Sequence, residues 1–436
     1  MQLLKVFIDN KKRDWNEVVT INVESKIIKR KILTTGTIIF VYVLGRHILI
    51  PGVDVKQILS VGDNQSLFKF VSGMTGGDLS TLSFFSLGLG PWMSTLILWR
   101  VFGLIKKFEL DKLTLKKSYI LKIILSSIIA GIQAIAISST VSVRSNFLFI
   151  GNNPLITNIM LAFIMVTGAI FLIWLSNMNE AFGIGGPIVL ILAGIVIKVP
   201  DYVVTYLGDM SQEHLNITDI VQCIVFIIAF IFLVRIAIIM QESELRLPIR
   251  NTLGNGDFVS KSYLPIQVNP AGGMPLMYSM TVTVLPQYGL QLIHSFYPHN
   301  YYVTYLMNNS SLSQPMGVTA YIIILTMLTM GFSFVNVDPE KICTDLLHSG
   351  DYIENMEPGE ATRQYLTTKI YHLGIVGALY LDVISGIPLY IGTINSDFTQ
   401  YGLAAGTVII LVSLSSNIYD QIHALLIKND YPKLIE

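Results

Sequence analysis

The chain has 436 residues, of which 52% are hydrophobic and only 13% are charged, and its mean hydropathy is +0.60. These values exclude a soluble globular protein of this length and indicate an integral membrane protein. Basic and acidic residues balance to a net charge of zero, so the orientation in the membrane must follow from where the basic residues stand. Two cysteines without a CxxC pair predict no disulfide framework.

The N-terminal segment, residues 1–31, holds eight lysines and arginines with acids between them. No small-residue cleavage site follows its first apolar run, so we expect no cleaved signal peptide. The apolar residues Leu3, Leu4, Phe7 and Ile8 fit a short amphipathic helix lying on the membrane surface. A solvated basic tail fits the same residues equally well.

Ten apolar runs reach the length of about 20 residues that a helix needs to cross a bilayer. An even number of spans places both termini on one side, and the termini with the loops on that side hold 20 of the 29 lysines and arginines. The opposite loops hold only Lys56, Lys69 and Arg144, so the positive-inside rule predicts cytoplasmic termini. The expected spans are 32–50, 81–103, 118–141, 155–177, 184–200, 218–240, 272–296, 315–337, 365–387 and 400–423.

Between the first two spans lies a segment, "VKQILSVGDNQSLFKFVSGMTGGDLS" (55–80), that reads neither as a span nor as an ordinary turn. Irregular backbone is tolerated at membrane depth only where protein or water surrounds it. A re-entrant plug is therefore one interpretation of this segment, and a surface loop is the other.

Three spans begin with glycine, proline and polar residues where a lipid-facing helix would favour leucine. They are the second span, with "FFSLGLGPWMS" (84–94), the fifth, with "GIGGPIVLIL" (183–192), and the seventh, with "NPAGGMPLMYSM" (269–280). Ser94 and Gln133 add polar atoms inside the second and third spans. Such residues are typical of a wall of an aqueous cavity and equally of close helix contacts. Discontinuous helices also occur in solute carriers, so this pattern alone does not separate a channel from a carrier.

Catalytic and cofactor motifs are absent from the sequence. There is no phosphate-binding loop, no HExxH, no GxSxG and no His or Cys cluster with metal-ligand spacing, so we expect no enzyme activity, no cofactor and no metal site. Asp382 is the only clear intramembrane acid. It supports the alternative of an ion-coupled carrier of a small solute, although an acid near a helix end or one bonded to a neighbouring hydroxyl explains it as well. An intramembrane hydrolase lacks a nucleophile and base at a suggestive spacing.

A series of ordered motifs resembles the SecY family, the channel subunit of the bacterial protein-conducting channel. The second-span motif is similar to the family's Ile-Phe-Ala-Leu-Gly-Ile-x-Pro-Tyr-Ile. The other matches run from one end of the chain to the other: "PGVD" (51–54), "VTGAIFLIWL" with "GIGG" (166–186), "LRLPI" (245–249), "LPIQVNPAGGMP" (264–275), "NVDPEKICTDLLHSGDYIENMEPGEATRQYL" (336–366), "GALY" (377–380) and "ALLIKNDYPKLI" (424–435).

The resemblance implies an all-α, polytopic fold with ten transmembrane helices in two five-helix halves, 32–207 and 208–436, around an hourglass pore. It implies a plug at 55–75 and a lateral gate between spans two and three on one side and spans seven and eight on the other, with Ser94 and Gln133 as polar gate residues. The family's ring of apolar pore residues carries over onto Leu89, Met93, Ile188, Ile191, Met277 and Leu411, with an ambiguous register in spans five and ten. Such a ring excludes hydrated ions because it offers them no hydrogen-bond partner.

In this family, unfolded preprotein is passed across the bacterial cytoplasmic membrane or released into lipid, with a SecA-type motor ATPase and small SecE-like and SecG-like subunits as partners and no nucleic acid. Two cytoplasmic loops, 241–271 and 338–364, would dock the motor. Their expected docking residues are Arg246, Arg250, Lys261, Glu357, Pro358, Gly359, Glu360 and Arg363.

These loops depart from the housekeeping pattern. The first loop is reduced to three basic residues, and Glu357 stands where the family has an arginine before Pro-Gly-Glu. A reversed charge at a docking position disfavours a generic acidic partner and leaves ribosome docking in doubt. The departures resemble the accessory SecY paralogue of some Gram-positive bacteria, which works with a dedicated motor and exports large serine-rich glycosylated adhesins.

Overall fold

The computed structural model describes residues 26–50, 77, 82–104, 113–139, 154–197, 217–251, 262–297, 300–354, 356–394 and 396–430. Most of these residues are helical, as the resemblance predicts. The expected plug at 55–75 and the N-terminal residues 1–25, where a surface helix or a basic tail was expected, lie outside the described residues.

The first half of the chain forms a group of helices that pack on one another. They are α2 (Lys26–His47), α5 (Gly90–Leu104), α6 (Leu115–Ser138), α7 (Pro154–Phe182) and a short apolar helix, Gly186–Ile197. Helix α7 packs on α2 and α6, and α6 packs on α5. Helices suit a chain rich in apolar residues, because each helix satisfies its own backbone hydrogen bonds without water.

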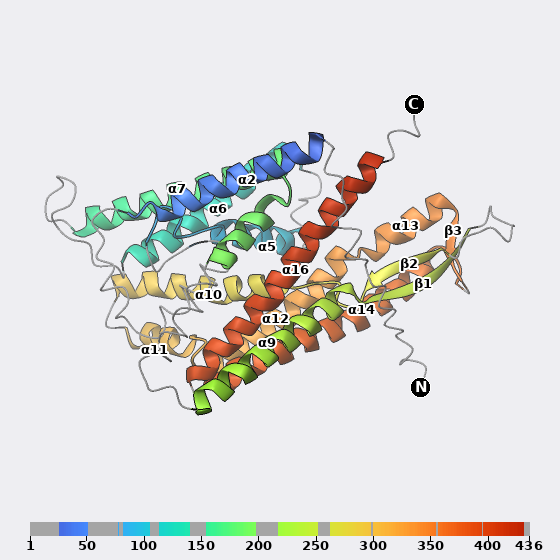
Figure 1. Ribbon diagram of the computed structural model, residues 1–436. Coiled ribbons are helices and arrows are strands. Elements are labelled where there is room, and N and C mark those ends of the chain that lie inside the picture. The colour runs from blue at the N-terminus through green and yellow to red at the C-terminus, as the bar shows by residue number, and fades with distance from the viewer. Residues whose placement is uncertain are drawn as a thin grey trace.

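The second half adds the remaining helices. They are α9 (Ile217–Glu242), α10 (Met274–Phe296), α11 (Tyr301–Asn309), α12 (Pro315–Asn336), α13 (Pro339–Ser349), α14 (Glu360–Leu381), the π-helix η3 (Asp382–Gly386), α15 (Ile387–Gly392) and α16 (Ser396–Asp430). Helix α10 packs on α12 and α16, and it also contacts α5 and α6 of the first half. Figure 1 shows the long helices crossing the molecule between an end that carries α11 and an end that carries α13.

Each of the ten expected spans contains helical residues in the described part of the chain. Five helices there are long and apolar enough to cross a membrane, which makes the chain a multi-pass membrane protein; the count of ten spans stays a prediction. The largest difference is at the second span, which was expected to begin near residue 81 with an interrupted start, whereas α5 begins at Gly90. Residues 84–89 form turns, and Leu82 (φ 41°) and Gly88 (φ 59°) have a left-handed backbone that an α-helix does not accept.

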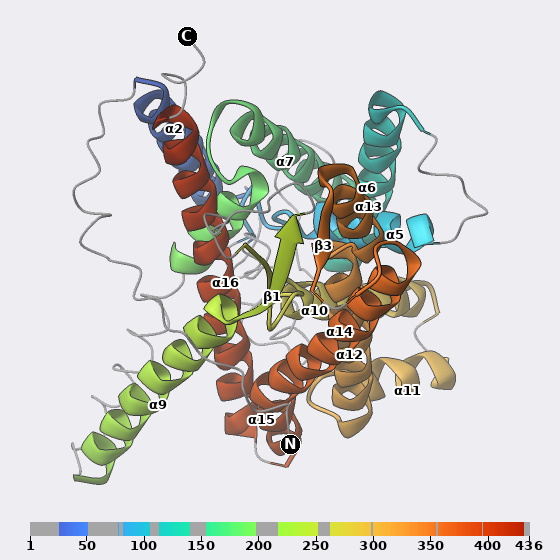
Figure 2. The same cartoon turned by 90° about the vertical axis from the view of Figure 1, so that its right-hand side faces the viewer.

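A small three-stranded sheet was not predicted and qualifies the expected all-α class. Its strands are β1 (Glu244–Asn251), β2 (Tyr263–Gln267) and β3 (Asp351–Ile353), in the order β2-β1-β3 with antiparallel pairing. Both expected cytoplasmic loops contribute to it, so they form one folded unit with α13 and the start of α14. A separate apolar cluster holds this unit together, made of Leu247, Ile266, Leu346, Ile353 and Leu366. Figure 2 looks onto this end of the molecule, with the long helices arranged around the sheet.

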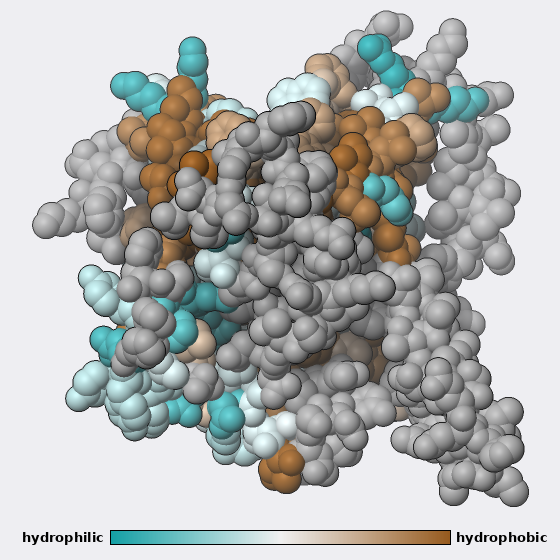
Figure 3. Space-filling view, turned by 90° about the vertical axis from the view of Figure 1, so that its left-hand side faces the viewer, coloured by the Kyte–Doolittle hydropathy of each residue, from teal (hydrophilic) through white to brown (hydrophobic). Residues whose placement is uncertain are grey.

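The outer faces of the long helices are apolar. Leu33 on α2, Phe163 on α7, Phe232 on α9 and Met327 on α12 are each about two-thirds exposed or more. A soluble protein rarely exposes so much contiguous apolar surface, whereas lipid accepts it. Figure 3 looks onto the end that carries α11 and shows apolar side chains, in brown, over the upper part of that face.

Candidate functional site

The interrupted start of the fifth expected span is held by polar side chains from neighbouring helices. Residues 183–185 bend before the helix Gly186–Ile197, and Gly185 has a φ of 76°. The buried Asn179 donates from Nδ2 to the carbonyls of Ile184 and Gly186, at 2.8 and 2.9 Å. Thr35 Oγ1 on α2 accepts from the N–H of Ile184 at 2.9 Å. The turn can therefore lie inside the protein because its backbone groups have partners there.

The seventh expected span starts in the same way. Gly272, with a φ of 66°, precedes the first residue of α10 by two positions, and its carbonyl accepts from Nδ2 of the buried Asn269 at 3.0 Å. The N–H of Gly273 donates to Ser413 Oγ on α16 at 2.9 Å, and Asn336 Nδ2 on α12 donates to the carbonyl of Pro270 at 3.0 Å. The start of α10 is thus fixed by two other helices.

The turns before α5 are fixed by backbone contacts with the end of α2. The N–H of Phe84 donates to the carbonyl of Ile48 at 2.9 Å, and the N–H of Ile50 donates to the carbonyl of Leu82 at 3.0 Å. Helix α7 lies against the same turns: a Cβ added at Gly168 would stand 1.9 Å from the carbonyl oxygen of Phe84. Only glycine at position 168 permits this approach. These contacts set the position of the residues that follow, beginning with Leu89.

The six predicted ring residues all belong to one apolar cluster. Leu89, Met93, Ile191 and Met277 are buried members of it, and Ile188 and Leu411 are partly buried and pack against it. They come from the three interrupted starts and from the middle of α16. This cluster is the apolar core of the long helices and also contains residues of α2, α6, α7 and α12, so the six positions lie in or against the same interior. Their role in a pore stays a prediction.

The two predicted polar gate residues are also buried. Ser94 lies on α5 and donates its hydroxyl to the carbonyl of Gly90 at 3.0 Å, within the same helix. Gln133 lies on α6, which packs on α5. Both helices contact α10, so both residues lie on helices that meet the second half of the chain. This placement fits the expected seam, and the gating role stays a prediction.

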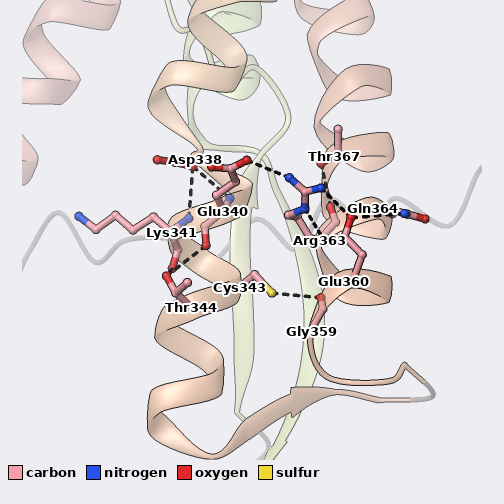
Figure 4. Close-up of polar contacts among 10 residues, drawn as sticks. All are labelled: Asp338, Glu340, Lys341, Cys343, Thr344, Gly359, Glu360, Arg363, Gln364 and Thr367. Atoms are coloured by element: carbon pink, nitrogen blue, oxygen red, sulfur yellow. Dashed lines mark hydrogen bonds and ion pairs between the residues drawn. The ribbon is translucent and has the colours of Figure 1, made fainter. Parts of the chain in front are cut away.

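The expected docking arginines form ion pairs within the folded unit that the two expected cytoplasmic loops build with α13 and the start of α14. Arg363 on α14 donates from Nε and Nη2 to the carboxylate of Glu360, at 2.9 and 2.6 Å, and from Nη1 to Glu340 on α13 at 2.9 Å (Figure 4). The hydrogen bonds from Arg363 lower the pKa of the exposed Glu360 carboxyl. The start of α14 is thereby tied to α13.

The arginines of β1 are paired in the same way. Arg250 pairs with Glu354, which follows β3, and Arg246 pairs with Glu244 at 2.8 Å while its guanidinium lies 4.8 Å from the centre of the Tyr263 ring. These arginines were expected only as bases of a docking loop, and their acidic partners were not predicted. A partner protein would therefore meet arginines whose charges are largely compensated.

The loop before α14 carries the remaining docking positions. Glu357 and Pro358 are exposed, and the carbonyl of Glu357 accepts from Thr362 Oγ1 at 2.7 Å. Gly359 has a φ of 106°, which favours glycine, and its carbonyl accepts from the Cys343 thiol at 3.2 Å, as Figure 4 shows. Lys261 lies outside the described residues.

Asp382, the residue that supported a coupled carrier, belongs to the π-helix between α14 and α15. Its Oδ2 accepts from Thr326 Oγ1 on α12 at 2.8 Å, and Tyr321 and Ser385 are joined by a neighbouring hydrogen bond of 3.1 Å. A local hydroxyl partner was one of the predicted explanations of this acid. In the described part of the chain, no group of three or more His, Cys, Asp or Glu residues is placed to hold a metal ion.

Sequence reasoning missed the asparagines that hold the interrupted starts. Asn179 stands four residues before Gly183, and Asn269 stands three residues before Gly272. An asparagine ahead of a glycine-rich break was the available signal, because its amide can donate to the backbone that the break leaves without helical partners.

Comparisons with known proteins agree with this geometry. The family model described as SecY matches residues 83–419. The chain is 48% identical over 408 residues to the accessory Sec system protein translocase subunit SecY2 of Leuconostoc gelidum subsp. gasicomitatum, covering 94% of this chain and 97% of the relative. It is 32% identical to the protein of the same name from Streptococcus salivarius, covering 94% and 98%.

Solved structures show the same fold. The structure titled "The structure of a protein conducting channel" matches with a TM-score of 0.64 at 18% identity, covering 94% of each chain. Sec61 in the canine ribosome-channel complex matches with a TM-score of 0.60 at 18% identity and the same coverage. Since the family model spans most of the chain, and relatives at least 30% identical are covered almost completely, this chain belongs to the SecY family.

Proposed function

We propose that this chain is the channel-forming subunit of an accessory protein translocase, which passes unfolded polypeptide across the bacterial cytoplasmic membrane. The observation that carries the proposal is the burial of Leu89, Met93, Ile191 and Met277 in the apolar core at the starts of three interrupted helices, where we place an apolar constriction. Such a constriction offers no hydrogen-bond partner to a hydrated ion, so it seals the resting protein. The names of the relatives support the accessory assignment.

A carrier of small solutes is not favoured. That alternative depended on the discontinuous helices and on Asp382, but the family match accounts for the helices, and Asp382 has a hydroxyl partner on α12. The folded cytoplasmic unit of β1, β2, β3 and α13 also fits a protein partner better than a small solute. We therefore assign the driving force to a SecA-type motor ATPase and propose small SecE-like and SecG-like subunits as membrane partners. No cofactor and no nucleic acid belong to the proposal.

The methionines at two ring positions suit polypeptide passage. Met93 and Met277 have unbranched, flexible side chains that can pack around segments of different shape. A rigid ring of branched side chains would fit one diameter only. For sufficiently apolar segments, exit through the seam into lipid is favourable, because leucine, isoleucine, phenylalanine and valine each favour insertion by about 0.3–0.6 kcal/mol.

The proposal is tested by transport in proteoliposomes that contain the chain with its small subunits and the cognate motor. We expect ATP-dependent protection of an unfolded preprotein from external protease. Exchanging Glu357 for arginine should lower the rate with the cognate motor severalfold, since the reversed charge lies on an exposed loop and acts on encounter with the partner. Glu357→Gln should fall between wild type and Glu357→Arg.

Two results would count against these assignments. If the preprotein is never protected while the motor hydrolyses ATP, the chain is not the conduit. If Glu357→Arg transports equally with the cognate motor and with a housekeeping SecA, the loop does not select the motor.

A further inference from the structure

A stack of one cation and two aromatic rings joins the two halves of the chain at the cytoplasmic ends of their helices. The guanidinium carbon of Arg100, near the end of α5, lies 4.9 Å from the centre of the Phe332 ring on α12. The Phe332 ring is stacked on the ring of Tyr278 on α10, with centroids 5.0 Å apart and planes at 17°. Both rings are buried, whereas Arg100 is exposed.

The expected seam runs between α5 and α6 on one side and α10 and α12 on the other. Arg100 lies on the first side of this seam. Phe332 and Tyr278 both lie on the second side, so they can move together. A similar contact, Lys122 of α6 at 5.4 Å from the ring centre of Trp99 on α5, lies entirely on the first side. Of these three contacts, the one between Arg100 and Phe332 alone crosses the seam and must break when the two sides separate.

We propose that Arg100 is a positioning residue that clasps the seam shut at its cytoplasmic end. The inference rests on the proposed function in one respect, namely that this seam opens during transport. A guanidinium over an aromatic ring is stabilised by the ring's quadrupole, by about 0.5–1 kcal/mol when exposed and by about 2 kcal/mol when desolvated. That range corresponds to an open-to-closed ratio changed by about 2- to 30-fold. Such a clasp is strong enough to bias the resting state and weak enough for an inserting segment to displace.

The experiment measures the distance across the seam in the full chain, held in lipid nanodiscs without motor or substrate. Spin labels are attached to cysteines introduced at Phe102 on α5 and Val335 on α12, which are both exposed, after replacement of Cys223 and Cys343. Arg100→Gln should raise the open-to-closed ratio by about 2- to 30-fold. Arg100→Lys, which keeps the charge, should raise it less.

Two further variants distinguish loss of the contact between Arg100 and Phe332 from a general loosening of the helix packing. Phe332→Leu should open the seam as Arg100→Gln does, and the double variant should open it no further, because both changes remove the same contact. Lys369→Gln removes a cation–π contact that lies within α14, where the ammonium is 5.3 Å from the centre of the Tyr365 ring, and should leave the ratio unchanged.

An unchanged distance distribution in Arg100→Gln overturns the proposal, as does an equal opening in Lys369→Gln. Because the readout needs no transport, a failure of the proposed function leaves this result interpretable. A chain that conducts no polypeptide would still show whether Arg100 holds its two sides together.

Discussion

Replacing Leu89 with asparagine is expected to make the resting protein conduct ions. Leu89 is 1% exposed and is one of the six core residues that we assign to the constriction. Asparagine has nearly the same size but carries an amide, which gives water and ions the hydrogen-bond partners that a hydrophobic constriction withholds. We expect at least a severalfold increase in ion flux through proteoliposomes in the absence of motor and substrate.

Two control variants make this result specific. Leu89→Met keeps an apolar side chain and should remain sealed, since methionine already occupies two ring positions. Leu389→Asn buries the same amide in the same core cluster, but on α15 and at a position that is not one of the six predicted ring residues. If Leu389→Asn conducts as well as Leu89→Asn, the flux reports general loosening of the helices, and the ring assignment loses its support.

Substituting Gly168 with alanine is expected to lower the free energy of unfolding. The added Cβ would stand 1.9 Å from the carbonyl oxygen of Phe84, so α7 must move away from the turns that precede Leu89. Overpacking of this kind costs about 1–3 kcal/mol of unfolding free energy. Thermal unfolding in detergent, followed by reaction of the buried Cys343 thiol with a fluorescent reagent, measures the loss.

Gly131→Ala is the matched control for this substitution. Gly131 is also helical, on α6, but a Cβ at that position meets no atom within 4 Å. Alanine is favoured over glycine inside a helix by about 1 kcal/mol, so Gly131→Ala should not lower the unfolding temperature. Equal unfolding temperatures for both variants would contradict the close packing of α7 on the Phe84 turn.

The helical segments were predictable because their signal is local. A run of about 20 apolar residues has few structures open to it in lipid, and each expected run contains helix where the structure describes it. The start of α5 was misplaced by nine residues, since Leu82 takes a left-handed backbone that leucine rarely adopts. A tertiary contact causes this late start of α5, because the isolated β-bridge between Leu49 and Ser83 fixes the turn at Leu82.

The sheet had a readable signal that was not used. In β1, Leu245, Leu247 and Ile249 alternate with Arg246, Pro248 and Arg250, which is the period of a strand with one buried face. Its pairing with β3, about 100 residues away, has no local signal and depends on α13 and α14 bringing Ile353 against the cluster of Leu247 and Leu366.

The resemblance predicts the residues of the candidate ring, but it does not predict the contacts that position them. Nothing in the sequence links Ser413 to Gly273 or Thr35 to Ile184, because these partners are brought together only by helix packing. The ion pairs of Arg363 were missed for the same reason. Counting charges along the chain predicts an orientation in the membrane but does not show which charges remain available to a partner.

Site-specific crosslinking of an arrested substrate tests whether polypeptide passes through the predicted ring. A photoreactive residue is placed at Met93 in the predicted ring and, as a reference, at Phe163 on the lipid-facing surface of α7. A preprotein carrying a folded C-terminal domain is then driven by the motor until it stalls. We expect strong crosslinks from Met93 to the arrested chain and none from Phe163. If the substrate is protected but no crosslink forms from Met93, polypeptide takes another route and the predicted ring is not the constriction of a polypeptide channel.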